Sequence, residues 1–332
     1  MIRRIAVTGA TGFIGRHVVG HLLSRGDEVR AIVRPESRRA VAAGAVDVRT
    51  PFQLDELTKA FAGTDVVVHL AGVVSARDFQ TYHSANVAAT AAVGQAVAGV
   101  GARLVHISSL AAAGPASASA PRTEDDECRP INWYGETKLG GERALAGIER
   151  LKWTALRPGV VYGPGDRAVL ALFRLARHGW LPHVGPRDAA YSFVFIDDLV
   201  AIVAAAIDRF VDRGDRGEHG EDIDHGVFFV AHPVPVTTDR LAHALQSALS
   251  RDVRVLHIPQ AAARAAASAA DVIQRLTGRA LPFNRRRFDE MSVEGFVCRV
   301  DRLRDRLGIE TRVDLPEGFA RTAAWYREHG WI

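Results

Sequence analysis

Short apolar runs alternate with helical stretches through the first part of the chain. The apolar runs predict strands over residues 5–8, 28–33, 46–48, 65–70, 103–107 and 153–156. The stretches between them predict helices over residues 13–24, 55–62, 81–100 and 134–150. Strands that alternate with helices are typical of a parallel, doubly wound α/β sheet.

Beyond residue 165 the pattern becomes less regular. It predicts helices over 168–179 and 197–210, strands over 192–196 and 226–230, and a packed alanine-rich helix over 260–270. We therefore expect a parallel-sheet domain over residues 1–164, to which segments near 191–210 and 226–231 return. A smaller mixed α/β domain over residues 165–332 would cover the carboxyl edge of the sheet and bind the substrate.

Composition and charge are ordinary for a soluble globular protein. The chain has 332 residues, of which 48% are hydrophobic and 24% charged. The net charge is +4, but arginines alternate with acids, as in residues 299–306, which is typical of a solvated helix face. The arginine run 285–287 is too short to bind nucleic acid by itself. We therefore expect no nucleic-acid partner.

The first residues and the cysteines bear on location. The apolar run after Met1 soon meets a glycine loop and gives no sign of a secretory signal. No apolar run reaches the roughly 18 residues that a membrane span needs. Cys128 and Cys298 are far apart and have no metal-ligand spacing. We expect a cytoplasmic protein with no membrane span and no metal.

A glycine-rich loop follows the first predicted strand and opens the first helix, with glycines at 9, 12 and 15. Gly9 can take a tight turn, Gly12 lets a pyrophosphate approach the backbone, and Gly15 lets helix and strand pack closely. The amino terminus of the helix offers unpaired N–H groups to the phosphates. This context indicates a dinucleotide-binding Rossmann sheet rather than an ordinary glycine turn.

Lysine is rare in this chain, and one of its few copies follows a tyrosine by four residues. Of 42 lysine and arginine residues only three are lysine, and Lys138 is one of them. Residues four apart share a helix face, so Tyr134 and Lys138 would point into one pocket. A neighbouring ammonium lowers the pKa of a tyrosine from its usual value of about 10. Tyr134 could then exchange a proton with a carbonyl or alcohol oxygen.

These motifs resemble those of the short-chain dehydrogenase/reductase superfamily in its extended branch, the NAD-dependent epimerase/dehydratase family. The resemblance covers essentially the whole chain, and its motifs occur in the family's order: the glycine loop, 69–72, Asn86 with Thr90, Ser108 with Ser109, Tyr134 with Lys138, and 157–165. It implies that Ser109, Tyr134 and Lys138 are catalytic. Ser109 would hold the substrate oxygen, although a helix cap explains it equally on spacing and Ser108 competes with it. Lys138 would also bind the nicotinamide ribose.

The resemblance also implies cofactor contacts at the carboxyl ends of the strands. They are Gly9, Thr11, Gly12, Phe13, Ile14, Gly15, Arg34, Arg38, Thr50, Pro51, Leu70, Ala71, Gly72, Asn86, Ile107, Pro158, Gly159, Val160 and Val161. An asparagine such as Asn86 more often holds neighbouring backbone than acts directly. The candidates for substrate contact are Ser75, Leu110, Trp133, Arg167 and Phe193.

The end of the second strand bears on which nicotinamide cofactor binds. NAD-preferring members place an acid there for the ribose 2′-OH, whereas this chain has Val33 followed by Arg34. An arginine attracts a 2′-phosphate and can bind it through two hydrogen bonds. Arg38 and Arg39 could assist, although Arg34 as an ordinary surface arginine is the alternative. We expect NADP(H) to be preferred, with NAD(H) possible.

Two segments bear on the reaction. Leu110 and Ala111 follow Ser109, where sugar-nucleotide dehydratases usually carry an acid pair, so dehydration is disfavoured. The segment 157–165 is more similar to that of dihydroflavonol-reductase and 3β-hydroxysteroid-dehydrogenase-like members than to that of sugar epimerases. Together with apolar Leu110, Trp133 and Phe193, it favours the interconversion of a ketone and a secondary alcohol as the reaction on a small-molecule substrate. A nucleotide-sugar epimerase and a non-catalytic dinucleotide sensor or assembly factor are the alternatives.

Extended members commonly dimerise through two helices of each subunit. Here these are the helices predicted over 81–100 and 134–150. The first is rich in small residues, which permit close approach of another helix. Burial in the chain's own core explains the same residues. We expect a homodimer.

Overall fold

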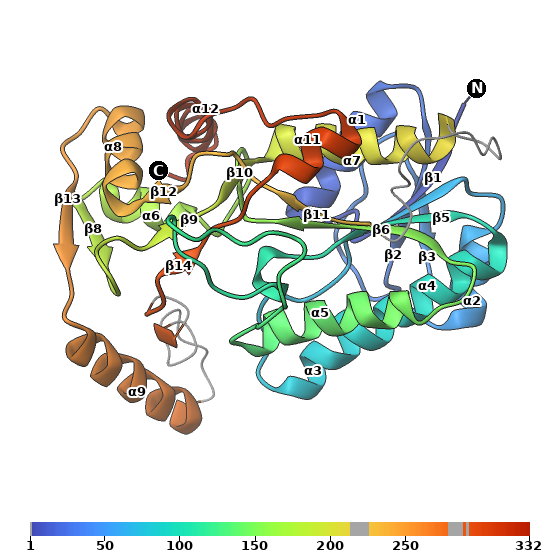
Figure 1. Ribbon diagram of the computed structural model, residues 1–332. Helices are drawn as coiled ribbons and strands as arrows, with labels where there is room; N and C mark the ends of the chain where they lie inside the picture. Colours follow the sequence, from blue (N-terminus) through green and yellow to red (C-terminus); the bar gives the residue numbers. More distant parts are fainter. Residues whose placement is uncertain (1, 213–225, 278–287, 290–291) are drawn as a thin grey trace.

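A seven-stranded parallel sheet forms the centre of the molecule in the computed structural model (Figure 1), which describes residues 2–212, 226–277, 288–289 and 292–332. The strand order is β11-β6-β5-β4-β1-β2-β3. The strands are β1 (Arg4–Thr8), β2 (Glu28–Val33), β3 (Val46–Arg49), β4 (Val66–His69), β5 (Arg103–Ile107), β6 (Lys152–Pro158) and β11 (Gly226–Val230). The predicted doubly wound parallel sheet is confirmed. The arginine run 285–287 lies outside the described residues.

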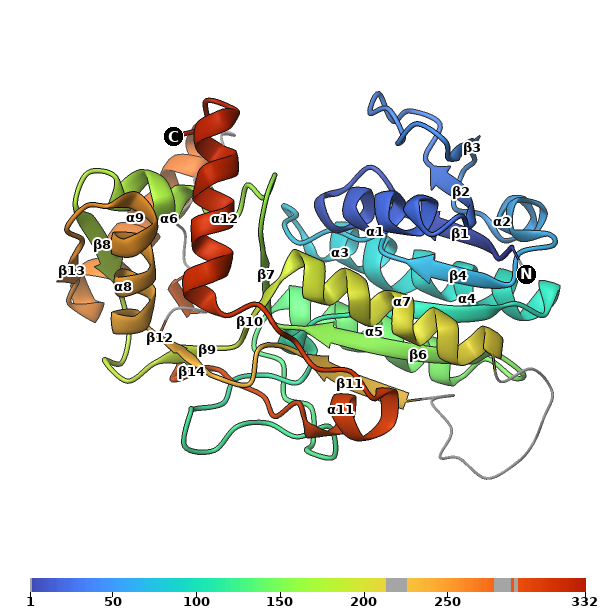
Figure 2. The same cartoon turned by 90° about the horizontal axis from the view of Figure 1, so that it is seen from above.

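Helices cover both faces of this sheet (Figures 1 and 2). Alternate residues of each strand enter opposite layers: Val66 and Val68 belong to one buried cluster and Val67 to the other. A sheet that is buried on both faces needs such apolar runs on every strand. One layer holds α1 (Phe13–Ser24) and α7 (Ile196–Asp212), and the other holds α2 (Leu54–Phe61), α4 (Ala89–Val100) and α5 (Trp133–Ala146).

The single helix predicted over 81–100 is three helical pieces. These are α3 (Phe79–His83), a π-helical turn η1 (Ser84–Ala88) and α4. Asp78 caps α3 by accepting a hydrogen bond from the Thr81 amide at 2.7 Å, so the helix starts earlier than the prediction. Turns of π-helix inside α-helices often mark functional sites. The helix predicted over 134–150 starts at Trp133 and ends at Ala146 instead, with Gly147 as its C-cap, and Arg150 beyond it has a positive φ of 60°.

The C-terminal part contains several short strands, of which the strand predicted over 192–196 is found as β10 (Phe193–Phe195) and the others were too brief to predict. β7 (Val160–Tyr162) pairs in parallel with β10. The others are β9 (Ala190–Tyr191) with β12 (Val236–Thr237) and β14 (Gly295–Phe296), and β8 (Trp180–His183) with β13 (Arg254–His257). The helices are α6 (Leu170–Ala176), α8 (Thr238–Leu249), α9 (Gln260–Thr277), α11 (Asp301–Leu307) and α12 (Leu315–Glu328).

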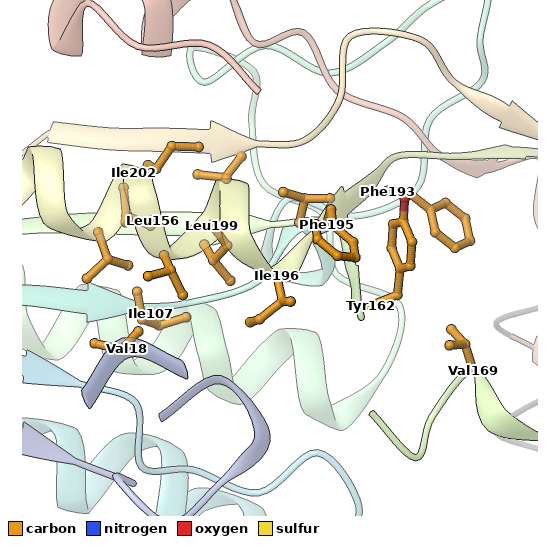
Figure 3. Packing of buried hydrophobic residues seen from close by; sticks show 14 of the residues in the cluster. Val18, Ile107, Leu156, Tyr162, Val169, Phe193, Phe195, Ile196, Leu199 and Ile202 are labelled. Atoms are coloured by element: carbon orange, nitrogen blue, oxygen red, sulfur yellow. The ribbon is translucent and has the colours of Figure 1, made fainter. Parts of the chain in front are cut away.

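An aromatic cluster around Tyr162 packs α12 against β7 and β10, and Figure 3 shows Tyr162 with Phe193 and Phe195. The ring centroid of Tyr162 lies 5.8 Å from that of Phe193, 5.5 Å from Phe195 and 5.1 Å from Phe319 on α12.

The alanine-rich helix α9 is packed less than predicted. Of residues 260–270 in α9, only Ala263 and Ala267 are buried.

No helix in the described part of the chain is both long and apolar enough to cross a membrane.

Candidate active site

The glycine loop has the geometry of a phosphate cradle. Gly9 has a φ of +70°, and a Cβ there would lie 2.8 Å from the Ala71 amide nitrogen. A Cβ on Gly15 would lie 2.2 Å from the Gly9 carbonyl oxygen, so neither position accepts a side chain. Gly12 begins α1 with no side-chain cap, and a Cβ there would meet only the Gly9 oxygen at 3.2 Å. The uncapped amides of α1 therefore face an open surface, which fits the pyrophosphate of a dinucleotide.

Helix α5 brings Tyr134 and Lys138 to the end of the sheet. Asn132 caps the helix by accepting from the Gly135 amide at 2.7 Å. The Lys138 ammonium donates to the Ile107 carbonyl at 2.6 Å, at the end of β5. Lys138 is only 6% exposed, whereas Tyr134 is half-buried. The helix thus presents a buried ammonium and a reachable phenol on one face.

The turn that carries Ser109 is in direct contact with the start of α5. A Cβ on Gly135 would lie 2.3 Å from the Ala111 carbonyl oxygen, so the two backbones touch. The Ser109 hydroxyl oxygen accepts from the Ala111 amide at 3.2 Å and caps the 3-10 turn η2 (Leu110–Ala112). The capping role considered from the sequence is therefore present. Because the oxygen is the acceptor in that bond, its own O–H is left to donate elsewhere.

Ser108 has a different role from its neighbour. It is buried, and its hydroxyl donates to Glu142 on α5. The Glu142 carboxylate also accepts two hydrogen bonds from the Arg157 guanidinium, at 2.9 and 2.5 Å. Both side chains of this ion pair are about 5% exposed. Ser108 therefore belongs to a buried polar network that fixes α5 against β5 and β6.

Burial sets the charge state of Lys138. Removal from water lowers the pKa of its ammonium to about 8, against the opposing effect of the Glu142 carboxylate. The ammonium therefore stays mostly protonated at neutral pH but titrates far below an ordinary lysine. A perturbed lysine beside a tyrosine is the arrangement that proton-transfer sites use.

Two buried histidines lie near this lysine, and no role was predicted for either. His69 and His106 are register partners on β4 and β5, and their rings stack with centroids 5.3 Å apart. His69 bonds Thr8 Oγ1 through Nδ1 at 2.7 Å and Thr90 Oγ1 through Nε2 at 3.0 Å. Burial, with the Lys138 charge, lowers the pKa of His69 to about 3, so the ring is neutral. The feature of the sequence that could have indicated this pair is a histidine near the end of each of two apolar strands.

Asn86 holds backbone, as the sequence suggested for this residue type. Its amide oxygen accepts from the Val73 amide at 2.8 Å, and its nitrogen donates to the Val73 carbonyl at 3.0 Å. The same nitrogen donates to Thr137 Oγ1 at 3.1 Å. Asn86 thereby ties the loop after β4 to the helix that carries Tyr134.

The remaining cofactor candidates lie at the carboxyl ends of strands. Arg34 and Arg38 are exposed on the loop after β2, and the Arg39 guanidinium donates to the Thr11 carbonyl of the glycine loop at 3.4 Å. Thr50 is buried after β3, where its amide donates to the Val33 carbonyl at 3.0 Å. The others lie at or after the carboxyl ends of β1, β3, β4 and β6: Phe13, Ile14, Pro51, Leu70, Gly72, Pro158, Gly159, Val160 and Val161.

The substrate candidates divide into two groups. Ser75, Leu110 and Trp133 lie on the segments that follow β4 and β5 and on the first turn of α5. Phe193 instead lines a cavity of about 820 Å³ together with residues of α8 and of the start of α12. Arg167 stacks over the Trp331 ring at 5.3 Å. The described residues that line the cavity include Phe193 but not Ser109, Tyr134 or Lys138.

The described residues contain no cluster of three or more histidine, cysteine, aspartate or glutamate side chains that could hold a metal ion. Both cysteines are free thiols.

Comparison with known proteins places these features in context. The sequence model of the NAD dependent epimerase/dehydratase family matches residues 5–224. Ceramide reductase from Caulobacter vibrioides is 26% identical, over 99% of this chain and 96% of its own. UDP-glucose 4-epimerase from Vibrio cholerae is 26% identical, over 97% and 95%. The solved structure of MoeE5 in complex with UDP-glucose and NAD is 25% identical and has a TM-score of 0.72, over 98% of this chain and 99% of that one.

Proposed function

Because the chain belongs to the NAD dependent epimerase/dehydratase family of extended short-chain dehydrogenases/reductases, and so is an NAD(P)-dependent reductase or epimerase, we propose that it interconverts a ketone and a secondary alcohol. The buried ammonium of Lys138, on the same helix face as the half-buried Tyr134, carries this proposal. The similarity to a ceramide reductase supports a ketone or alcohol substrate of apolar character.

The residues of the chain supply the proton chemistry. In reduction, Tyr134 gives its phenolic proton to the carbonyl oxygen and regains one from solvent. Ser109 donates a hydrogen bond to the same oxygen, because its own oxygen is already an acceptor for Ala111. Lys138 lowers the pKa of the phenol through its charge. The nicotinamide, when bound, supplies the hydride to the carbonyl carbon, so one hydride and one proton convert the ketone to the alcohol.

Replacing Tyr134 with phenylalanine tests this role. We expect Tyr134→Phe to lower kcat by about 100-fold or more, because the proton donor is lost. Binding of NADPH, measured by fluorescence titration, should stay within about twofold, since hydroxyl loss leaves the glycine loop intact. Ser108→Ala is the control: it should lower stability and leave kcat within a few fold. If Tyr134→Phe turned over as fast as wild type, the mechanism would be wrong.

NADP(H) is the cofactor that we propose to be preferred. Arg34 is exposed directly after β2, and Arg39 binds the glycine loop through Thr11, which supports an electropositive site for a 2′-phosphate. We expect Arg34→Ala to raise the Kd for NADPH about tenfold, as loss of a charged hydrogen bond does, and to change the Kd for NADH less than twofold. Arg177→Ala, a distant exposed arginine, is the control. Equal losses for both cofactors would contradict the preference.

A nucleotide-sugar epimerase is the second candidate, supported by the similarity to UDP-glucose 4-epimerase. An epimerase oxidises and then reduces the same sugar and releases no reduced cofactor. Incubation with UDP-glucose and bound cofactor, followed by product chromatography, separates the two reactions. A new sugar nucleotide with no net NADPH consumption would favour the epimerase.

A further inference from the structure

A group of exposed apolar side chains lies beside Tyr134 and is not used by the proton chemistry. Its members are Val74, Phe79, Ile131 and Trp133, which are 73%, 41%, 39% and 36% exposed. We call these four residues the apolar patch. Scattered exposed apolar residues are normal, but a contiguous group marks an interaction site or a ligand groove.

The residues of the patch come from three segments that lie close together. The ring centroids of Phe79 and Trp133 are 5.9 Å apart. The Tyr82 ring lies 6.5 Å from that of Trp133, and its hydroxyl donates to the Val74 carbonyl at 3.1 Å. Ile131 is two residues before Trp133 in the chain. The loop after β4, α3 and the start of α5 are therefore joined, with α3 against α5 (Figure 1).

Hydrogen bonds hold each of these segments in place. Asn86 fixes Val73, the neighbour of Val74, and Asp78 caps the helix that carries Phe79. Thr137 Oγ1 donates to the Trp133 carbonyl at 2.7 Å. The patch is thus a preorganised surface, which lowers the ordering cost of binding.

We propose that the apolar patch binds a long apolar chain carried by the ketone or alcohol substrate. The proposal rests on the proposed ketone reduction, because it assigns the substrate class of that same site. The loop that carries Val74 starts beside the buried lysine, because a Cβ on Gly72 would lie 3.9 Å from the Lys138 Nζ. Trp133 lies in the first turn of α5, the helix that carries Tyr134 and Lys138. The four side chains contribute no charge, which suits an alkyl or isoprenoid chain and not the polyanionic body of a sugar nucleotide.

The apolar chain of the substrate takes no part in the redox step. Hydride from the reduced nicotinamide and the Tyr134 proton convert only the carbonyl to the alcohol, and the apolar chain stays intact. Its contribution is binding energy that positions the carbonyl, and it should grow with each methylene that the patch removes from water.

A series of methyl ketones, from methyl ethyl ketone to methyl undecyl ketone, tests the proposal. We expect kcat/KM for NADPH-dependent reduction to rise by up to about fourfold for each added methylene until the patch is covered. In the double variant Val74→Ser/Phe79→Ser, the ratio of kcat/KM for the longest to the shortest ketone should fall at least about tenfold, because the patch loses most of its apolar area. Leu175→Ser, which replaces a similarly exposed residue on α6, should leave this ratio unchanged.

Two outcomes would overturn the proposal, and one separates it from the proposed function. If the double variant kept the same ratio of kcat/KM for the longest to the shortest ketone, the apolar chain of the substrate would not contact the patch. Conversion of a wild-type dimer to a monomer by Val74→Ser/Phe79→Ser, with the ratio unchanged, would make the patch a subunit interface. If wild type reduces none of the ketones, titration calorimetry with methyl undecyl ketone and NADP+ still tests whether the patch binds the ketone. Binding heat that is seen with wild type and lost in the double variant would support the patch although the proposed reduction fails. The absence of binding heat with wild type would overturn both the patch and the proposed reduction.

Discussion

Lys138, which we propose to be catalytic, has an environment that disfavours its charge. Its ammonium bonds the Ile107 carbonyl, yet burial lowers its pKa from 10.5 to about 8. That difference corresponds to roughly 3 kcal/mol against the charged form. Active sites often keep such groups at the expense of stability. The lysine is therefore a residue at which activity and stability should respond in opposite directions.

Replacing this lysine with methionine tests that opposition. We expect Lys138→Met to lower kcat about 100-fold or more and to raise the free energy of unfolding at pH 7 by about 1–2 kcal/mol, after loss of the bond to Ile107. The folded-state pKa is below the unfolded one, so the burial penalty is complete below pH 8. It disappears between pH 8 and 10.5, and the stability gain should disappear with it.

Urea denaturation at pH 7 and pH 10 measures this effect, and Lys152→Met supplies the control. Lys152 is exposed at the start of β6, so its replacement should change stability little at either pH. A Lys138→Met protein less stable than wild type at pH 7 would show that the ammonium stabilises the fold.

At the scale of elements, the position of α5 depends on a buried ion pair. Glu142, one turn after Lys138, binds Arg157 of β6 and Ser108 at the end of β5. The Arg157 guanidinium also lies 5.8 Å from the Phe229 ring centroid on β11. Three neighbouring strands, β5, β6 and the edge strand β11, and the helix that carries Tyr134 therefore meet at one polar group. Removing one partner leaves an uncompensated buried charge.

We expect Glu142→Gln to lower the free energy of unfolding by about 3–5 kcal/mol, because Arg157 loses its counter-charge. The exposed pair Glu127–Arg129 provides a matched control, and Glu127→Gln should cost under about 1 kcal/mol. The double variant Glu142→Met/Arg157→Met should recover most of the loss, since no buried charge remains. Chemical denaturation of the four proteins measures these differences. A Glu142→Gln protein as stable as the control would contradict the role of the pair.

At the scale of the whole molecule, we propose a homodimer formed through α4 and α5. Val93 and Ala96 of α4 are buried in the chain's own core, so core packing and not a dimer contact explains these two residues. Ala88 and Gln95 are exposed, so they leave a face for a second copy. Light scattering should give about twice the 35.9 kDa of one chain.

A charge on that face should separate the subunits. We expect Ala88→Glu to give a monomer, because a carboxylate buried between helices loses its hydration. Ala261→Glu, on the exposed side of α9, should leave the mass unchanged. A monomeric wild type at micromolar concentration would exclude this dimer.

The parallel sheet, the glycine loop and the spacing of Tyr134 and Lys138 were predictable from the amino-acid sequence. These features rest on local patterns: apolar runs for buried strands, glycines where no Cβ fits, and residues four apart on one helix face. The boundaries of α3 and α5 were not predictable in the same way, because they depend on the side-chain caps at Asp78 and Asn132 and on the end of α5 at Gly147.

Which distant residues meet depends on the tertiary structure. The stacked His69 and His106, the network of Ser108, Glu142 and Arg157, and the apolar patch join segments that are separated by many residues. The folded chain also places Phe193, which lies within the predicted strand 192–196, on the lining of a cavity formed with α8 and the start of α12. Periodicity reports which face of an element is buried, but not which neighbour covers it. Packing between elements therefore determined the environment of Lys138 and the surface beside Tyr134.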